Sequence, residues 1–299
     1  MTALNRHRRE IPLYIMLLVP VALVLVYSYG PMFGIVMAFQ RYETSLGFLR
    51  SEWVGFDNYR RIFSLPDTWQ VIFNTFYIAS MKIVVETIAA IAVALLLNEI
   101  RSAFFKRTIQ TIIYFPYFLS WVILGGALRD MLASDGLLNQ FRIWLGFDAI
   151  SFLGIPKLFP FILVVTETWQ ITGFGTIIFL AAIAGINQDL YEAAVIDGAG
   201  RLKQTWHITL PGISSTIIVM CVISMGYILN AGFDQILMLY NPLVLSTGDV
   251  IDTWVYRAGL QHAQFSLAAA MGLMRSTVSF VLISISYYLA YKFADYRIF

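Results

Sequence analysis

Long apolar stretches separated by polar segments dominate the pattern along the chain. Six of these stretches are close to or longer than the ~20 residues that a helix needs to cross the hydrocarbon layer of a membrane. They cover about residues 11–39, 71–97, 108–128, 158–183, 212–233 and 265–291. The pattern predicts an all-α integral membrane protein with six transmembrane helices. We expect a single transmembrane domain over residues 1–299, with a short N-terminal tail at residues 1–10.

The composition supports a membrane environment. Hydrophobic residues make up 59% of the 299 residues and charged residues only 13%, which is about half the charged share of a soluble domain. A chain of this kind has too few polar groups to cover a water-exposed surface. The net charge of +2 gives no indication of a nucleic-acid partner.

The first apolar stretch follows a basic cluster at residues 6–9. It is longer than the apolar core of a signal peptide, and no small-residue cleavage site closes it, so we expect a retained first span. Six spans place both termini on one side of the membrane. That side also holds the Lys106-Arg107 pair and slightly more Lys and Arg residues than the other. This bias favours cytoplasmic N and C termini.

The polar segment between the fourth and fifth spans, residues 184–211, has the features of a short helix, a bend and a second short helix. Asp189 followed by Glu192 has the spacing of a capping box, which predicts a helix start near Leu190. Gly198 is expected to end that helix. Pro211 suits the first turn of the fifth span.

The same segment resembles the EAA motif of permease subunits of binding-protein-dependent ABC importers. The residues that match its anchor positions and spacing are Glu192, Ala193, Ala194, Gly198, Ile208, Leu210 and Pro211. The resemblance implies a type I importer permease core whose coupling helix docks on a cytoplasmic ATPase. It also places Asp197, between the first anchors and Gly198, among the coupling residues.

Other segments resemble the sugar branch of that family. They are residues 54–59 with Asn74-Thr75, residues 136–139, residues 233–242 and residues 250–260. This resemblance implies a carbohydrate solute, such as an oligosaccharide or a polysaccharide fragment. The alternative is the same permease architecture carrying a non-sugar solute. An intramembrane enzyme is a more distant alternative, because no paired carboxylates, metal set or activated nucleophile is visible.

The resemblance also implies partners. The chain contains no Gly-Lys pair and so no P-loop; we therefore expect ATP and Mg²⁺ to be bound by a separate ATPase and no cofactor in this chain. The implied assembly contains a homologous second permease, two copies of the ATPase and an extracytoplasmic solute-binding protein, in a bacterial inner membrane. The histidines are far apart in the sequence, and no Cys or His spacing suggests a metal site.

Polar and aromatic side chains within the third to fifth spans, or directly after the fifth, are candidates for a carbohydrate path. These candidates are Tyr114, Tyr117, Trp121, Glu167, Trp169, Gln170, Tyr227, Asn230, Asp234 and Gln235. For each of them the alternative is an interfacial anchor or a residue of helix packing.

Four ionisable residues lie within predicted spans, where charge is costly and marks an interior or aqueous face. Lys82 and Glu86 are four residues apart on one helix face and are expected to pair. Glu167 and Arg275 are each isolated in apolar runs, and we expect them to meet between helices. An alternative for Arg275 is a contact with the carboxylate of an acidic sugar.

Overall fold

The computed structural model describes residues 3–226 and 228–294, and the chain divides into two compact units. The first unit combines Met1–Leu65 with Val255–Met274, and the second combines Pro66–Trp254 with Arg275–Phe299. Nearly all elements are helical, as predicted. A two-residue antiparallel ladder is the one strand pair in the described part of the chain.

In the first unit, a long apolar N-terminal stretch, Pro12–Phe39, is followed by short elements that hydrogen bonds connect. Its elements are α1 (Ala3–Val24), the π-helical η1 (Leu25–Tyr29), the 3-10 helical η2 (Gly30–Phe39), β1 (Gln40–Arg41), α2 (Gly47–Arg50), β2 (Glu52–Trp53), α3 (Asp57–Ser64) and the π-helical η7 (Arg257–Gln261). The start of α16 (Phe265–Ala294) also belongs to it. Asn58, which is buried, donates to the carbonyls of Ala38 and Gln40 at 2.9 Å each and fixes the turn from η2 into the ladder.

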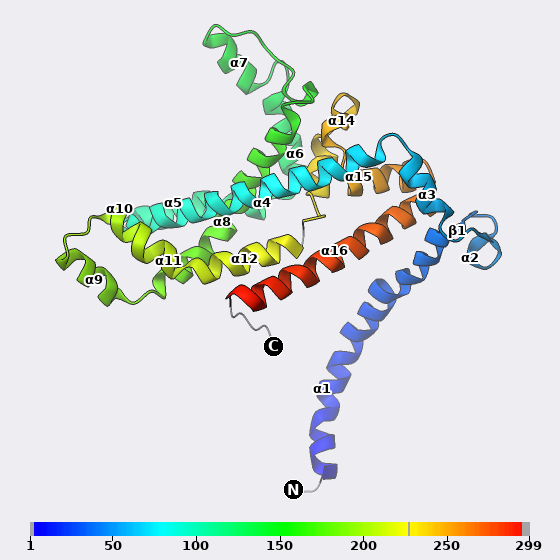
Figure 1. The fold of residues 1–299 in the computed structure, drawn as a ribbon, viewed down its shortest axis with the longest axis horizontal. Coiled ribbons are helices and arrows are strands. Elements are labelled where there is room, and N and C mark those ends of the chain that lie inside the picture. The colour runs from blue at the N-terminus through cyan, green and yellow to red at the C-terminus, as the bar shows by residue number, and fades with distance from the viewer. Residues whose placement is uncertain (1–2, 227, 295–299) are drawn as a thin grey trace. The chain divides into compact units, whose positions relative to one another are not determined.

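The second unit holds the remaining helices, including α4, α8 and α12 (Figure 1). Its elements are α4 (Thr68–Glu99), α5 (Ala103–Tyr114), η3 (Phe115–Phe118), α6 (Trp121–Leu132), α7 (Leu137–Trp144), η4 (Phe152–Gly154), α8 (Phe159–Ala184), α9 (Gln188–Ile196), α10 (Arg201–Gln204), the π-helical η5 (Thr205–Thr209), α11 (Leu210–Gly212), α12 (Ser214–Gly226), α13 (Phe233–Leu239), η6 (Pro242–Val244), α14 (Leu245–Gly248), most of α15 (Ile251–Tyr256) and the end of α16.

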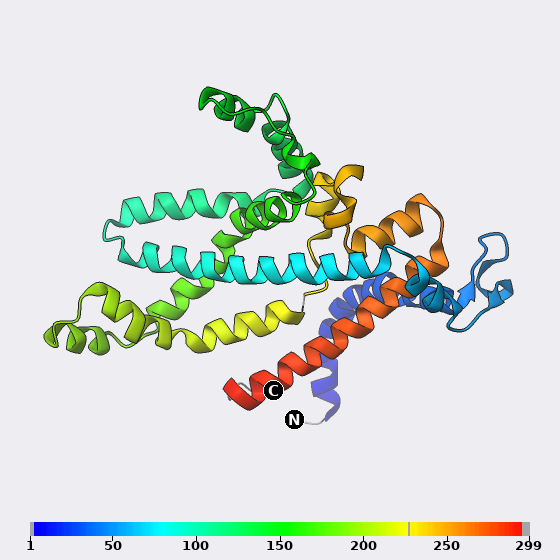
Figure 2. The same ribbon diagram turned by 45° about the horizontal axis from the view of Figure 1, so that its top comes forward.

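Helices α4 and α8 pack on each other at the centre of the second unit, and α8 crosses α4 in Figure 2. Small residues on α8 allow this close approach. A Cβ at Gly175 would lie 2.9 Å from the Cβ of Ala90 on α4, and one at Gly173 would lie 2.6 Å from the Ile113 carbonyl oxygen of α5. Apolar side chains pack on both sides of this contact, with Phe159 and Phe179 among the fully buried ones.

Among the described residues, four helical stretches are long and apolar enough to cross a membrane, and two bent helix pairs bring the possible number of spans to six. The four are Pro12–Phe39, Thr68–Glu99, Phe159–Ala184 and Phe265–Tyr288. These stretches agree closely with the first, second, fourth and sixth predicted spans.

The third and fifth predicted spans differ from the expectation of continuous helices. The third is bent by 102° between Ala103–Phe118 and Trp121–Trp144. The bend of 56° between Arg201–Gly212 and Ser214–Gly226 lies at the start of the fifth predicted span, but α12 ends at Gly226 rather than near residue 233. Hydropathy detects apolar length but not these bends, since Pro116 and Pro211 each lie among apolar residues.

Candidate functional site

The segment after α8 contains two short helices, α9 and α10, which form the compact α9–α10 loop. Asn187 caps α9, because its side-chain oxygen accepts a hydrogen bond from the Asp189 amide at 3.1 Å. The helix therefore begins at Gln188 and not near Leu190, so the predicted Asp189 capping box is wrong. The error arises because Asn187 lies in the extended conformation that an N-cap needs, whereas Asp189 is already helical.

The turn after α9 depends on Gly198, whose φ is +76°. Only glycine adopts this left-handed conformation without strain, and it reverses the chain after the helix. Its amide donates to the Val195 carbonyl at 3.0 Å. The predicted position of the bend is thus confirmed, and α10 begins three residues later at Arg201.

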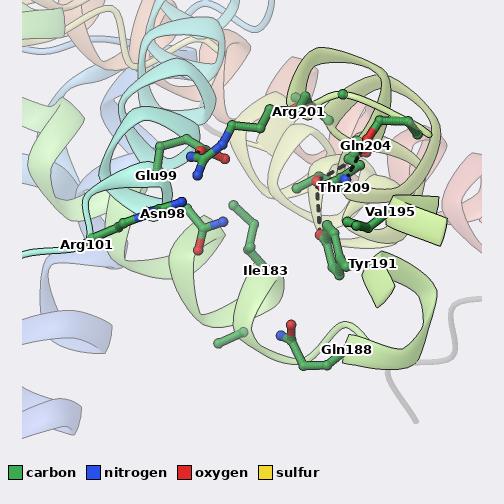
Figure 3. Close-up of a pocket in the computed structure, with 14 residues that line it drawn as sticks. Asn98, Glu99, Arg101, Ile183, Gln188, Tyr191, Val195, Arg201, Gln204 and Thr209 are labelled. Atoms are coloured by element: carbon green, nitrogen blue, oxygen red, sulfur yellow. Dashed lines mark hydrogen bonds and ion pairs between the residues drawn. The ribbon is translucent and has the colours of Figure 1, made fainter. Parts of the chain in front are cut away.

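Two contacts attach this loop to the rest of the second unit. Arg201, the first residue of α10, pairs with Glu99 at the end of α4. The Tyr191 hydroxyl lies 2.9 Å from the Thr209 hydroxyl and joins α9 to η5. Figure 3 shows these side chains around an open groove of about 620 Å³. The groove lies between the loop and the ends of α4 and α8.

The outer surface of the loop is apolar and uncovered. The exposed fraction is 86% for Ile196 and 74% for Leu202, and Trp206 is also exposed, whereas Val195 lines the groove. Exposed apolar side chains concentrated on so short a segment are typical of an interaction surface.

The coupling residues predicted from the EAA resemblance are either exposed or half-buried. Glu192, Ala193, Asp197 and Gly198 are exposed on the loop. Leu210 packs instead against the apolar cluster between α4, α8 and α12. The exposed residues are accessible to another protein, whereas Leu210 anchors the loop to the helices. Ala194 and Ile208 are half-buried and line a second groove of about 410 Å³ between α9 and α10.

A buried polar cluster lies among α4, α8 and α13 in the second unit. The Lys82 ammonium pairs with Glu167 at 2.8 Å and donates to the Ala231 carbonyl at 2.7 Å and to the Gln235 side-chain oxygen. The Gln235 amide nitrogen donates in turn to the Leu163 carbonyl and the Thr166 hydroxyl, at 2.8 and 2.7 Å. The side chains of Lys82 and Glu167 are only 6% and 17% exposed. The cluster therefore satisfies its charge internally.

These pairings correct the sequence prediction. Lys82 pairs with Glu167 and not with Glu86, and Arg275 pairs with Asp252 at 2.7 Å and not with Glu167. The reason is tertiary. Packing of α4 on α8 brings Glu167 within 2.8 Å of the Lys82 ammonium. Glu86 lies one turn further along α4, so a contact with Lys82 would require both side chains to extend along the surface of that helix. Burial raises the pKa of Asp252, and the Arg275 guanidinium partly offsets that rise.

The break in the third predicted span lies against the middle of α8. Gln170 donates to the Leu119 carbonyl at 3.0 Å, and Tyr117 stacks on Phe174 with ring centroids 4.9 Å apart. The carbonyl of residue 119 has lost its helical partner at the break, and the Gln170 amide replaces it. The fifth predicted span is also interrupted beside α8, at residues 228–232.

The residues predicted to line the carbohydrate path differ in their exposure. Asn230, Asp234 and Trp169 are exposed, whereas Tyr114 and Trp121 are half-buried. Gln235 has no exposed surface, and its side-chain contacts all lie within the buried cluster. Tyr227 lies outside the described residues. Asp252, and Gly232 with its φ of +89°, are among the residues of these contacts that had not been singled out from the sequence. A glycine between Asn230 and Asp234 was the available signal for a break.

Comparison with known proteins gives one family. The family described as "Binding-protein-dependent transport system inner membrane component" matches residues 86–295. The chain is 42% identical over 287 residues to Protein LplB of Bacillus subtilis (strain 168), covering 96% of this chain and 90% of that protein. It is 40% identical over 284 residues to the polygalacturonan/rhamnogalacturonan transport system permease protein YteP of the same strain, covering 95% and 88%.

A solved structure shares the fold over nearly the full length. It is a chain of a bacterial ABC transporter involved in the import of the acidic polysaccharide alginate, with a TM-score of 0.88 and 35% identity. The match covers 97% of this chain and 98% of that chain. A second structure of the bacterial alginate transporter, in complex with alginate pentasaccharide-bound periplasmic protein, matches with a TM-score of 0.87.

Proposed function

Because the chain belongs to the family of binding-protein-dependent transport system inner membrane components, we propose that it forms half of the translocation path of an ATP-driven carbohydrate importer. The solute is an oligosaccharide or a polysaccharide fragment. The named transport systems among its relatives, for polygalacturonan/rhamnogalacturonan and alginate, support this class of solute over a non-sugar one. The chain is a transport subunit, and ATP hydrolysis belongs to a partner.

The proposal includes a topology of six spans in one transmembrane domain over residues 1–299. The third span then includes the bend between α5 and α6, and the fifth span begins with α12, so that both termini and the α9–α10 loop lie in the cytoplasm. The basic cluster at residues 6–9 supports this orientation. The protein is placed as a multi-pass protein of a bacterial inner membrane.

The exposed apolar surface of the α9–α10 loop is the observation that carries the coupling role. Ile196 and Leu202 present apolar area with no cover within the described chain, and Glu192, Ala193, Asp197 and Gly198 lie exposed beside them. We place a cytoplasmic ATPase on this surface. That partner binds ATP and Mg²⁺, and closure of its two copies moves the permease through the loop.

The proposed assembly also contains a homologous second permease and an extracytoplasmic solute-binding protein. The structure that holds a periplasmic protein bound to alginate pentasaccharide supports such a binding protein. A polar path between two permease halves then receives the solute. Asn230 and Asp234, which are exposed at the break after α12, are the candidates we retain for contact with it. Gln235 is removed from that set, because it is buried.

The test uses the complete complex reconstituted in lipid vesicles, with the double variant Glu192→Ala/Gly198→Pro. We expect loss of the ATPase subunit from the purified complex and loss of binding-protein-stimulated ATP hydrolysis. Gly47 offers a matched control, because its φ is +66° and its amide also donates to a carbonyl, that of Glu43, at 3.0 Å. The variant Glu43→Ala/Gly47→Pro removes the same kind of turn elsewhere and should retain the ATPase subunit. Unchanged stimulated hydrolysis in the first variant contradicts the proposal.

A further inference from the structure

The break between α12 and α13 exposes backbone carbonyls that no helix can satisfy. Leu229 and Ala231 in this segment are buried, with exposed fractions of 2% and 1%, and a buried carbonyl without a donor costs free energy. Residues 228–232 lie between the two helices without helical structure. Each unsatisfied carbonyl there requires a donor from another part of the fold.

Two cations from different helices supply such donors. The Lys82 ammonium of α4 donates to the Ala231 carbonyl at 2.7 Å. The Arg275 guanidinium of α16 donates through Nε to the Leu229 carbonyl at 3.1 Å. The two carbonyls are on either side of Asn230, which is itself exposed.

Each cation is held in place by a carboxylate of yet another element. Glu167 of α8 lies 2.8 Å from the Lys82 ammonium, and Asp252 of α15 lies 2.7 Å from the Arg275 guanidinium. Both pairs are largely buried; the side-chain exposures are 6% and 17% for the first pair and 28% and 16% for the second. The carboxylates thus fix the direction in which each cation points.

The backbone at the break approaches the first pair so closely that only glycine fits. Gly232 has a φ of +89°, and a Cβ there would lie 2.6 Å from the Lys82 Nζ and 2.9 Å from the Glu167 Oε2. The break is therefore in direct contact with the Lys82–Glu167 pair, and this contact requires glycine at position 232.

We propose that Lys82 and Arg275 are positioning residues that hold the break at residues 228–232 in its non-helical conformation. Their function is to cap the Ala231 and Leu229 carbonyls on both sides of Asn230, and this sets where Asn230 and Asp234 are presented. The inference rests on the proposed function for its effect on transport. Charge neutralisation alone explains the two ion pairs but not their convergence on neighbouring carbonyls of one break.

Double variants separate these two explanations. Lys82→Met/Glu167→Gln and Arg275→Met/Asp252→Asn remove both charges of a pair, so that no unpaired charge remains, but they leave a carbonyl without its donor. Asn230→Cys in a Cys221→Ser background reports the conformation of the break through its rate of reaction with a water-soluble maleimide. All variants are made in the complete reconstituted complex. Arg275→Lys keeps a donor and a charge, and it provides the conservative rescue.

We expect each double variant to change the labelling rate at position 230 by about tenfold, as the loss of a charged hydrogen bond allows. The KM for solute transport should rise more than the maximal rate falls. Arg275→Lys should stay within about threefold of the parent. Arg142→Met is the matched control, since Arg142 also donates to a carbonyl, that of Asp148, but in an exposed loop; its labelling rate should equal that of the parent.

Parent-like labelling and KM in both double variants overturn the proposal, because the pairs then serve only to neutralise each other. If a double variant fails to assemble, the comparison of Arg275→Lys with Arg275→Met decides, and equal labelling rates in these two also overturn it. The labelling rate requires neither solute nor ATP. A parent complex that transports no carbohydrate thus contradicts the proposed function while leaving this readout intact.

Discussion

The α9–α10 loop and the break after α12 differ in how their functional groups are satisfied. In the loop, Ile196 is 86% exposed and the apolar surface has no cover within the described chain. At the break, the Lys82 side chain is 6% exposed and its ammonium has three acceptors. An uncovered apolar surface is stabilised by a partner, whereas a saturated polar cluster stabilises the chain itself.

The difference leads to opposite expectations for mutation. Substitutions at the break should lower the free energy of unfolding of the permease, because they leave buried polar groups unpaired. Substitutions on the loop surface should leave that free energy nearly unchanged and act on the partner instead. Four predictions test this contrast, in order of their expected effect on stability.

The largest effect is expected for Gly232→Ala. A non-glycine residue at a φ of +89° is strained, and the added Cβ would collide with the Lys82 ammonium. We expect a loss of about 3 kcal/mol in the free energy of unfolding. Denaturant titration of the purified chain in detergent measures it. Gly126→Ala is the control, because a Cβ there meets nothing within 4 Å. If the two variants have the same free energy of unfolding, the predicted clash at position 232 is wrong.

Gln235→Leu should cost about 2 kcal/mol, because it removes an acceptor from Lys82 and leaves the Leu163 carbonyl without its side-chain donor. The same titration measures the loss. Gln140→Leu is the matched control, since Gln140 donates to the Asp135 carbonyl at an exposed position. We expect that control to stay within about 0.5 kcal/mol of the parent. A larger loss in Gln140→Leu than in Gln235→Leu would show that burial of the cluster is not decisive.

Asn187→Ala should have a smaller and local effect of about 1 kcal/mol, since it removes the N-cap of α9. Hydrogen exchange of the α9 amides should become faster, with the Asp189 amide affected first. Asn187→Asp retains the oxygen acceptor and should preserve protection. Protection that is lost equally in both variants points away from capping.

Ile196→Ser should change the free energy of unfolding by less than about 0.5 kcal/mol, because the side chain is 86% exposed. Binding-protein-stimulated ATP hydrolysis by the complex should nevertheless fall by about tenfold, as expected for an interface residue of high energetic weight. Leu49→Ser serves as the control, because Leu49 is 99% exposed in α2 of the first unit. A similar fall in both variants removes the distinction between the loop and any other exposed apolar position.

Several elements could be predicted from residue patterns because their causes are local. The apolar lengths of α4, α8 and α16 follow from hydropathy along the chain, and the bend at Gly198 follows from the backbone freedom of glycine. Residues 184–211, which carry the EAA resemblance, contain the α9–α10 loop. The first residue of α9 was misplaced by two positions, because Asn187 and Asp189 are both good caps and backbone conformation chooses between them.

The sequence by itself determined that the chain is a helical membrane protein with an exposed loop between two spans, since apolar length, charge depletion and glycine position act locally. Tertiary structure decided the partners of the buried charges. Lys82 meets Glu167, and Arg275 meets Asp252, because helix packing joins residues that are 85 and 23 positions apart. It also decided that α12 ends at Gly226. A break within an apolar run leaves carbonyls that need donors from elsewhere, and the fold brings Lys82 and Arg275 to two of them.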